Sequence, residues 1–254
     1  MQGMVPLSGF GGVPYSAVRK AAPRNILDNS DFTNLVAQAG IGGNHGSIAY
    51  AADRWILDSG TVSYEAGVGL TLNGTIRQKL EIPPTGETSA FVGMASGAAS
   101  ISYADGAVTI TSSGGVLKWA ALYGGVYSAA TMPDYQPKGY GVELAECQRY
   151  CLVFNYGRTY FVSGYGVFAA DSTANLCIPL LNTMRTIPSI SDTSGNKWYI
   201  WSDGNVYVPT SISIWFSSYT MLGIKATGDF RGHNSQVCTV NINTAENVVF
   251  SADL

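Results

Sequence analysis

Charged residues are scarce in this sequence. Asp, Glu, Lys and Arg make up 12% of the 254 residues, about half of their usual share in soluble proteins. The formal net charge is −3, and the sequence has no basic stripe, so we expect no nucleic-acid partner. With 30 glycines and 15 tyrosines, this composition is typical of a β-rich protein with a Ser, Thr, Asn and Tyr surface, or one partly buried against other copies.

Long apolar runs are also missing. No window approaches 18 uninterrupted apolar residues, so we expect no insertion into a membrane. The first twenty residues do not resemble a signal peptide, because their charges come last and no apolar run precedes a cleavage site. Residues 1–24, rich in Gly and Pro, are expected to form an extended arm. The arm is either a disordered terminus or a peptide that inserts into a neighbouring subunit or a larger particle.

Cysteine and histidine are too few and too scattered for common metal or redox motifs. The sequence has no Cys-x-x-Cys pair, and its two histidines lie far from the cysteines. We expect four buried free thiols rather than disulfides or a zinc site, which fits synthesis in a reducing compartment such as bacterial cytoplasm. The cysteines are Cys147, Cys151, Cys177 and Cys238.

The sequence shows no catalytic arrangement. His45 and His233 lie in predicted loops, where we expect surface histidines, and no Gly-x-Ser-x-Gly elbow is present, which argues against a nucleophilic triad. Most of the acidic residues fall in turns or beside strand starts, so a carboxylate pair for glycan cleavage is not expected. The sequence therefore predicts a protein that is not an enzyme.

Two β-regions separated by one short helix account for the remaining pattern. In residues 25–139, short alternating runs are divided by turn signals, which predicts a jelly-roll β-sandwich with Trp55 in its core. Trp119 and Tyr123 stay undecided between core and surface. Residues 140–153 predict an amphipathic linking helix, because Leu144, Cys147 and Cys151 share one face whereas Glu143, Glu146 and Arg149 point elsewhere. Aromatic-rich alternating runs in residues 154–254 predict a second, C-terminal β-sandwich, so the fold class is all-β.

Acidic residues crowd the start of the first domain. Asp28, Asn29 and Asp31 could hold a structural calcium ion through their oxygen atoms, with Asp134 closing the site. We favour the other interpretation, a turn whose side chains cap the backbone. The sequence therefore predicts no metal and no cofactor.

Aromatic residues offer the best candidate binding surface. Sugars stack on exposed Trp and Tyr rings, and Trp198, Tyr199 and Trp201 occupy both faces of one predicted strand, so at least one ring should point away from the core. Tyr207 extends the group, and Trp215 and Tyr219 are further candidates. We predict a glycan-binding site here, and a subunit interface explains the same rings equally well.

Several segments resemble tailed-bacteriophage fibre and appendage proteins. Asn25–Phe32 resembles the opening strand of their carbohydrate-binding-module-like jelly rolls, and Asp53-Arg54-Trp55 the start of the next strand. Tyr140–Cys151 resembles the helix that joins two β-domains in that group, and residues 178–190 resemble a segment of their C-terminal domains.

This resemblance implies a structural virion protein, a tail or head fibre assembled in the host bacterial cytoplasm. It implies a homotrimer, attachment to other virion proteins through residues 1–24, and a C-terminal domain that binds a host cell-surface glycan, with many copies strengthening weak contacts. Two alternatives stay open. One is a capsid head fibre or decoration protein without a receptor role, and the other is a free carbohydrate-binding module.

Overall fold

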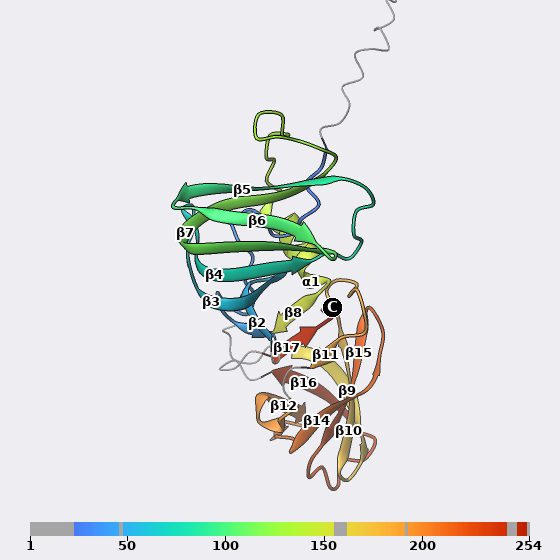
Figure 1. The fold of residues 1–254 in the computed structure, drawn as a ribbon. Coiled ribbons are helices and arrows are strands. Elements are labelled where there is room, and N and C mark those ends of the chain that lie inside the picture. The colour runs from blue at the N-terminus through green and yellow to red at the C-terminus, as the bar shows by residue number, and fades with distance from the viewer. Residues whose placement is uncertain (1–22, 46–47, 155–161, 191–192, 243–247, 253–254) are drawn as a thin grey trace, which may run out of the picture.

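The chain folds into two β-domains with a single helix between them (Figure 1). The computed structural model describes residues 23–45, 48–154, 162–190, 193–242 and 248–252. The predicted arm, residues 1–24, lies almost wholly outside the described residues. The prediction of an all-β protein with a short helix joining two β-domains is confirmed.

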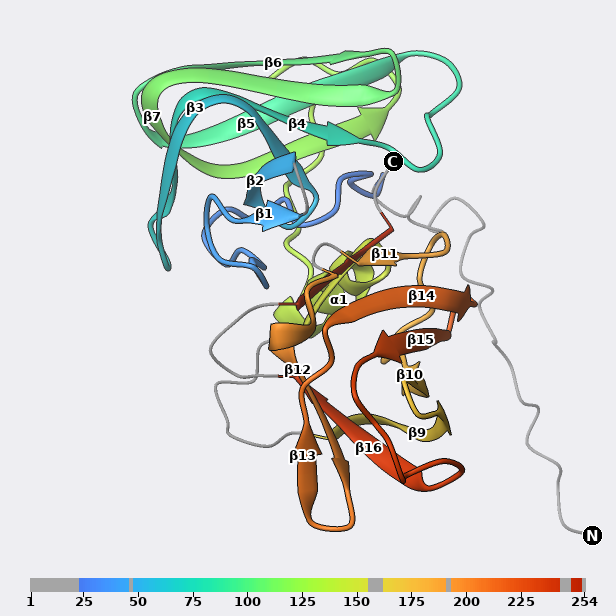
Figure 2. The ribbon, with the colours of Figure 1, turned by 90° about the horizontal axis from the view of Figure 1, so that it is seen from below.

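The first domain is one antiparallel sheet in the order β1-β2-β3-β4-β7-β5, with β6 also paired to β7. Figures 1 and 2 show that this sheet is strongly curled. It contains β1 (Asn44–His45), β2 (Ile48–Ala52), β3 (Trp55–Glu65), β4 (Gly69–Lys79), β5 (Thr88–Ser96), β6 (Ala99–Ala104) and β7 (Ala107–Gly124).

Paired glycines allow the long strands to bend. Gly60 of β3 lies directly opposite Gly74 of β4, and both have positive φ, at 87° and 143°. A Cβ atom on either glycine would overlap backbone of the facing strand. The register also shifts near this point in both β3 and β4. Close approach of the two backbones therefore requires glycine where the β3–β4 hairpin bends.

The entering chain runs along the free edge of β7. Backbone hydrogen bonds join Ile26 to Leu122 and Phe32 to Lys118, at 3.0 and 2.9 Å. The predicted opening strand is therefore bonded in a strand-like way, although only one residue forms a regular bridge. Trp55 is fully buried in the core of this domain, as predicted, and its indole N–H donates to the Asn29 carbonyl at 2.8 Å.

The linking helix, α1 (Tyr140–Gln148), is shorter than predicted. Residues 140–153 were expected to be helical, but β8 (Cys151–Phe154) begins three residues after the helix ends. Cys147 is buried, as expected, whereas Leu144 is only half-buried. The expectation that Glu143 points elsewhere is wrong, because its side chain is buried with Cys147.

The C-terminal domain consists of two packed antiparallel sheets. The larger has the strand order β13-β12-β16-β9-β10-β15-β14, and the smaller the order β11-β17-β8. One core cluster lies between them and includes Trp198, Phe168 and Phe250. The remaining elements are β9 (Val162–Ala170), β10 (Thr173–Pro179), β11 (Ser189–Ile190), η2 (Gly195–Lys197), β12 (Trp198–Ser202), β13 (Asn205–Tyr207), β14 (Ser211–Ser217), β15 (Met221–Thr227), β16 (Val237–Ile242) and β17 (Val248–Ser251).

The cysteines are all free thiols, as predicted. Three of them are buried, but Cys177 is only half-buried because it lies on the outer side of β10. Burial raises the pKa of Cys238 to about 11, so this thiol stays protonated and unreactive at neutral pH. No helix in the described ranges has the length and apolar character needed to cross a bilayer.

The packing of Trp198 generates a first prediction. Trp198→Ala removes a fully buried indole and should lower the free energy of unfolding by about 3–5 kcal/mol. Val206→Ala, an exposed position on the neighbouring strand, should change it by less than about 0.5 kcal/mol. Denaturant titration of both variants measures the difference. Equal stability of the two would show that the core assignment is wrong.

Candidate functional site

The predicted glycan-binding residues are divided between the two faces of β12. Trp198 and Ile200 point into the core, whereas Tyr199 and Trp201 lie on the outer face and are half-buried. This alternation confirms that at least one ring points away from the core. Trp198 has 0% exposure and no ring face that a sugar could reach, so its inclusion in the binding site is wrong.

Tyr207 also lies on the core side of the sheet. Its ring packs edge-on against Phe168 at 5.4 Å, and its hydroxyl lies 2.6 Å from Nε2 of His233. His233 is therefore a half-buried partner of Tyr207 rather than the surface histidine that we expected. His45 lies in β1 instead of a loop. Tyr207 is consequently better explained as packing than as a ligand contact.

The outer face of the large C-terminal sheet carries a continuous row of uncharged side chains. Pairing of neighbouring strands places one residue from each of seven strands in register. This row spans about 29 Å at the usual strand spacing of about 4.8 Å. It consists of Val206, Trp201, Thr239, Tyr165, Cys177, Gly223 and Phe216. We call this set the outer row.

Next to the outer row, Val237 and Val167 are paired across β16 and β9. Val237 is 71% exposed and Tyr165 is 63% exposed. Clustered large apolar side chains on a surface of polar residues commonly mark a site of interaction. This neighbouring row of Val237 and Val167 continues through Asn175, Lys225 and Ser213, so it carries one charged residue. In these two rows the outer face therefore combines aromatic and apolar side chains with uncharged polar ones and a single lysine.

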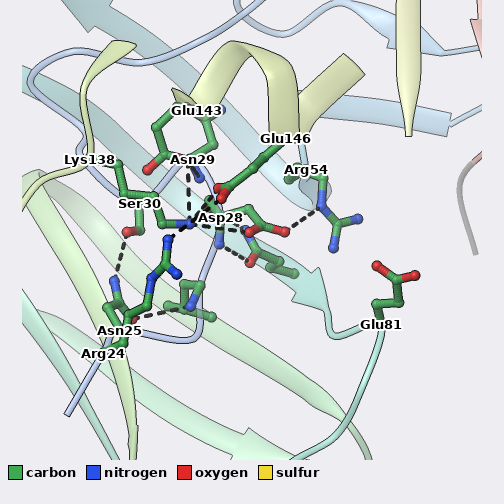
Figure 3. Close-up of polar contacts among 12 residues, drawn as sticks. Arg24, Asn25, Asp28, Asn29, Ser30, Arg54, Glu81, Lys138, Glu143 and Glu146 are labelled. Atoms are coloured by element: carbon green, nitrogen blue, oxygen red, sulfur yellow. Dashed lines mark hydrogen bonds and ion pairs between the residues drawn. The ribbon is translucent and has the colours of Figure 1, made fainter. Parts of the chain in front are cut away.

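A second cluster lies where α1 packs on the first domain (Figure 3). Lys138 Nζ donates to Glu146 Oε2 at 2.5 Å and lies 3.4 Å from Asp28 Oδ1 and 4.0 Å from Glu143 Oε2. Arg54 Nε donates to the other oxygen of Asp28 at 3.3 Å. Two cations thus share carboxylates from the entering chain and from α1. We call these five residues the junction cluster.

Glu143 is the most deeply buried carboxylate of the junction cluster, at 2% exposure. Its Oε2 accepts the Asn29 backbone N–H at 2.6 Å, whereas Oε1 has no hydrogen-bond partner. Burial raises the pKa of Glu143, and the negative charges of Glu146 and Asp28 add to the rise, while the Asn29 N–H and Lys138 oppose it. The carboxyl therefore holds its proton to a higher pH than an exposed glutamate.

Contacts around Tyr150 tie the C-terminal domain to the first domain. The guanidinium of Arg54 lies 3.4 Å from the centre of the Tyr150 ring, and the Tyr150 hydroxyl donates to Glu81 at 2.7 Å. Gln38 of the first domain donates to the Cys151 carbonyl at 2.9 Å, where β8 begins. A cation over an aromatic ring is stabilising, especially when partly desolvated. The helix and β8 are therefore fixed directly to the first sheet.

The acidic residues considered for calcium have other partners. Asp28 is bonded to Arg54 and lies within ion-pair distance of Lys138, and Asp31 accepts the backbone N–H and hydroxyl of Thr33. Asn29 binds the backbone of Val36. Asn29 and Asp31 thus cap the backbone as the preferred interpretation expected, whereas the Asp28 carboxylate pairs with two cations. Over the described ranges, no group of three or more His, Cys, Asp or Glu side chains is placed to hold a metal ion.

Sequence patterns missed the junction cluster, because its members come from distant segments and each has the appearance of a surface charge. The adjacent charges of Asp53 and Arg54 and the acidic positions of the helix were its only signals. No protein-family model, curated protein or solved structure matches the chain. The phage-fibre resemblance therefore stays a prediction.

The raised pKa of Glu143 generates a second prediction. A carboxyl whose pKa is higher when folded stabilises the fold below its unfolded pKa, about 4.5, and this contribution is lost as pH rises through the folded value. Glu143→Gln keeps an acceptor for the Asn29 N–H and removes the buried charge. The variant should equal the wild type near pH 4 and be the more stable of the two at about pH 7.

Thermal unfolding at a series of pH values measures this difference. Glu65→Gln is the control, because Glu65 is exposed at the end of β3, and it should follow the wild-type curve. A constant offset between Glu143→Gln and wild type at all pH values would contradict the assigned direction.

Proposed function

We propose that this chain is a non-enzymatic fibre or appendage protein of a tailed-phage particle, and that its C-terminal domain binds a host-surface glycan. The observation that carries the binding part is the outer row, where Trp201 and Tyr165 lie on one open sheet face with little charge. Stacking of sugar rings on aromatic faces needs such a surface. The resemblance of four sequence segments supports the virion part.

Backbone geometry adjusts the residues assigned to this site. Trp201 is retained from the sequence-based prediction, and Tyr199 lies at its margin on the same face. Trp198 and Tyr207 are replaced by Tyr165 and Val167, which strand pairing brings into the same region. The site therefore draws on β12, β16 and β9 rather than on one strand.

The test of glycan binding is a double variant, Trp201→Ala with Tyr165→Ala. Loss of two ring contacts should weaken binding by roughly tenfold or more, as for aromatic hot spots in other interfaces. Purified full-length protein is assayed on immobilised neutral bacterial polysaccharides, followed by whole bacteria. Tyr140→Ala is the matched control, because Tyr140 is an exposed ring at the start of α1, away from the outer row.

Retention of wild-type binding by a folded double variant would contradict the assignment. Equal loss in Tyr140→Ala would show that the effect is not specific to the outer row. Failure of the wild type to bind any of the polysaccharides or bacteria would leave the head-fibre or decoration role as the better proposal.

We also propose that the chain forms a homotrimer and that residues 1–24 attach it to other virion proteins. The sparse charge of the outer face agrees with subunit burial as well as with glycan binding. Light scattering of the full chain and of a chain lacking residues 1–24 should give a trimer in both cases. A monomer in both would contradict the proposal and favour the free binding module.

A further inference from the structure

A cavity of about 350 Å³ lies beside the point where the chain enters the first domain. Arg24, Asn25, Ser30 and Lys138 line one side, and all four are labelled in Figure 3. Small-molecule sites usually occupy roughly 300–1,000 Å³. This cavity therefore has room for one small ring, and it lies in a different domain from the outer row.

Aromatic rings form the apolar wall of the cavity. Tyr135 lines it and stacks on Trp119, with ring centres 5.0 Å apart and planes inclined by 10°. Tyr123 also lines it and packs edge-on against Tyr127 at 6.1 Å. Trp119, which the sequence left undecided, thus supports a cavity ring from behind. A rigid stack of this kind presents its ring without a further loss of side-chain freedom.

Tyr123 supplies the decisive observation. The residue is 1% exposed, yet its hydroxyl forms no hydrogen bond with any described residue. The hydroxyl oxygen is not cut off from solvent, so it is accessible from the cavity that Tyr123 lines. Burial and the negative charge of Asp134 raise the pKa of Tyr123, and both residues line the cavity. A polar group inside the cavity is therefore left for a ligand.

Two further polar side chains of the cavity make no hydrogen bond to a described residue. Asp134 and Gln136 are exposed at its rim, and within the described part of the chain neither side chain has a hydrogen bond. By contrast, Asn25 bonds Ser30 and the Ala120 carbonyl. Lys138 is occupied by the carboxylates of the junction cluster, so its positive charge is compensated. Arg24 lies 4.0 Å from Glu146, so its charge is also paired. The groups that remain are a hydroxyl, an amide and one carboxylate.

We propose that this cavity is a second ligand site and binds a single neutral sugar ring. The ring packs against the tyrosine wall, while the Tyr123 hydroxyl, the Asp134 carboxylate and the Gln136 amide bind its hydroxyl groups. A carboxylate and an amide accept and donate in the directions that ring hydroxyls need. This site does not depend on the proposed function of the outer row.

The test uses saturation-transfer NMR on the full-length protein with glucose, galactose and N-acetylglucosamine, and with glycerol as a polyol that has no ring. At least one of the three sugars should receive saturation, and glycerol should not. Tyr123→Phe removes only the unpartnered hydroxyl, so it should keep wild-type thermal stability and weaken sugar binding roughly five- to tenfold. Tyr127→Phe is the matched control and should bind like wild type.

The outer-row double variant, Trp201→Ala with Tyr165→Ala, separates the two sites and should retain the same transfer. Transfer to none of the three sugars would overturn the proposal. So would unchanged affinity in Tyr123→Phe, or loss of transfer in the outer-row variant, which would assign the sugar to the C-terminal domain. Failure of the outer row to bind polysaccharide would leave these results unaffected.

Discussion

The placement of the two domains depends on the ion pairs of Lys138. This amine lies close to carboxylates from the entering chain and from α1, in a site where its side chain is only 15% exposed. Removal of the Lys138 amine would leave the carboxylates that surround it uncompensated, at a cost of about 3–5 kcal/mol. The helix therefore has one favoured position on the first domain. Asp28 extends this constraint to Arg54, whose guanidinium covers the Tyr150 ring just before β8.

Because β8 follows α1 almost immediately, the position of the helix also orients the smaller C-terminal sheet. The Cys151 carbonyl accepts from Gln38 of the first domain, and the Tyr150 carbonyl accepts from Ala252 near the end of the chain. One short connection thus ties the first sheet to β8 and to the end of β17 in the smaller sheet. Lys138, which binds the helix, also lines the cavity beside Tyr123 and Tyr135. Ligand binding in the cavity and the packing of the helix therefore share a residue.

Alternation and turn residues were enough to predict the β-domains, the core position of Trp55 and the outward side of β12. These patterns gave wrong predictions where a residue lies in an environment that is unusual for its type. Glu143 was expected at the surface because carboxylates rarely lack solvent, but a backbone N–H from Asn29 and a nearby Lys138 stabilise it in the interior. We predicted a helix up to residue 153 because Cys151 continues the helical spacing. In the structure Cys151 instead begins β8. Pairing of Tyr165 with Thr239 depends on strand order, which local patterns do not contain.

The two candidate sites differ in the size of ligand that they fit. Trp201 and Tyr165 are separated by Thr239 in the outer row, so the positions are two strand spacings apart, about 10 Å. A ligand that contacts both must be an extended chain of several sugars, and an open sheet face sets no limit to its length. The cavity lined by Tyr123 and Tyr135 has a volume of about 350 Å³, and the Tyr135 ring in its wall is stacked on Trp119. Under the two proposals, the cavity would therefore take a terminal or free sugar ring, whereas the outer row would take a polymer.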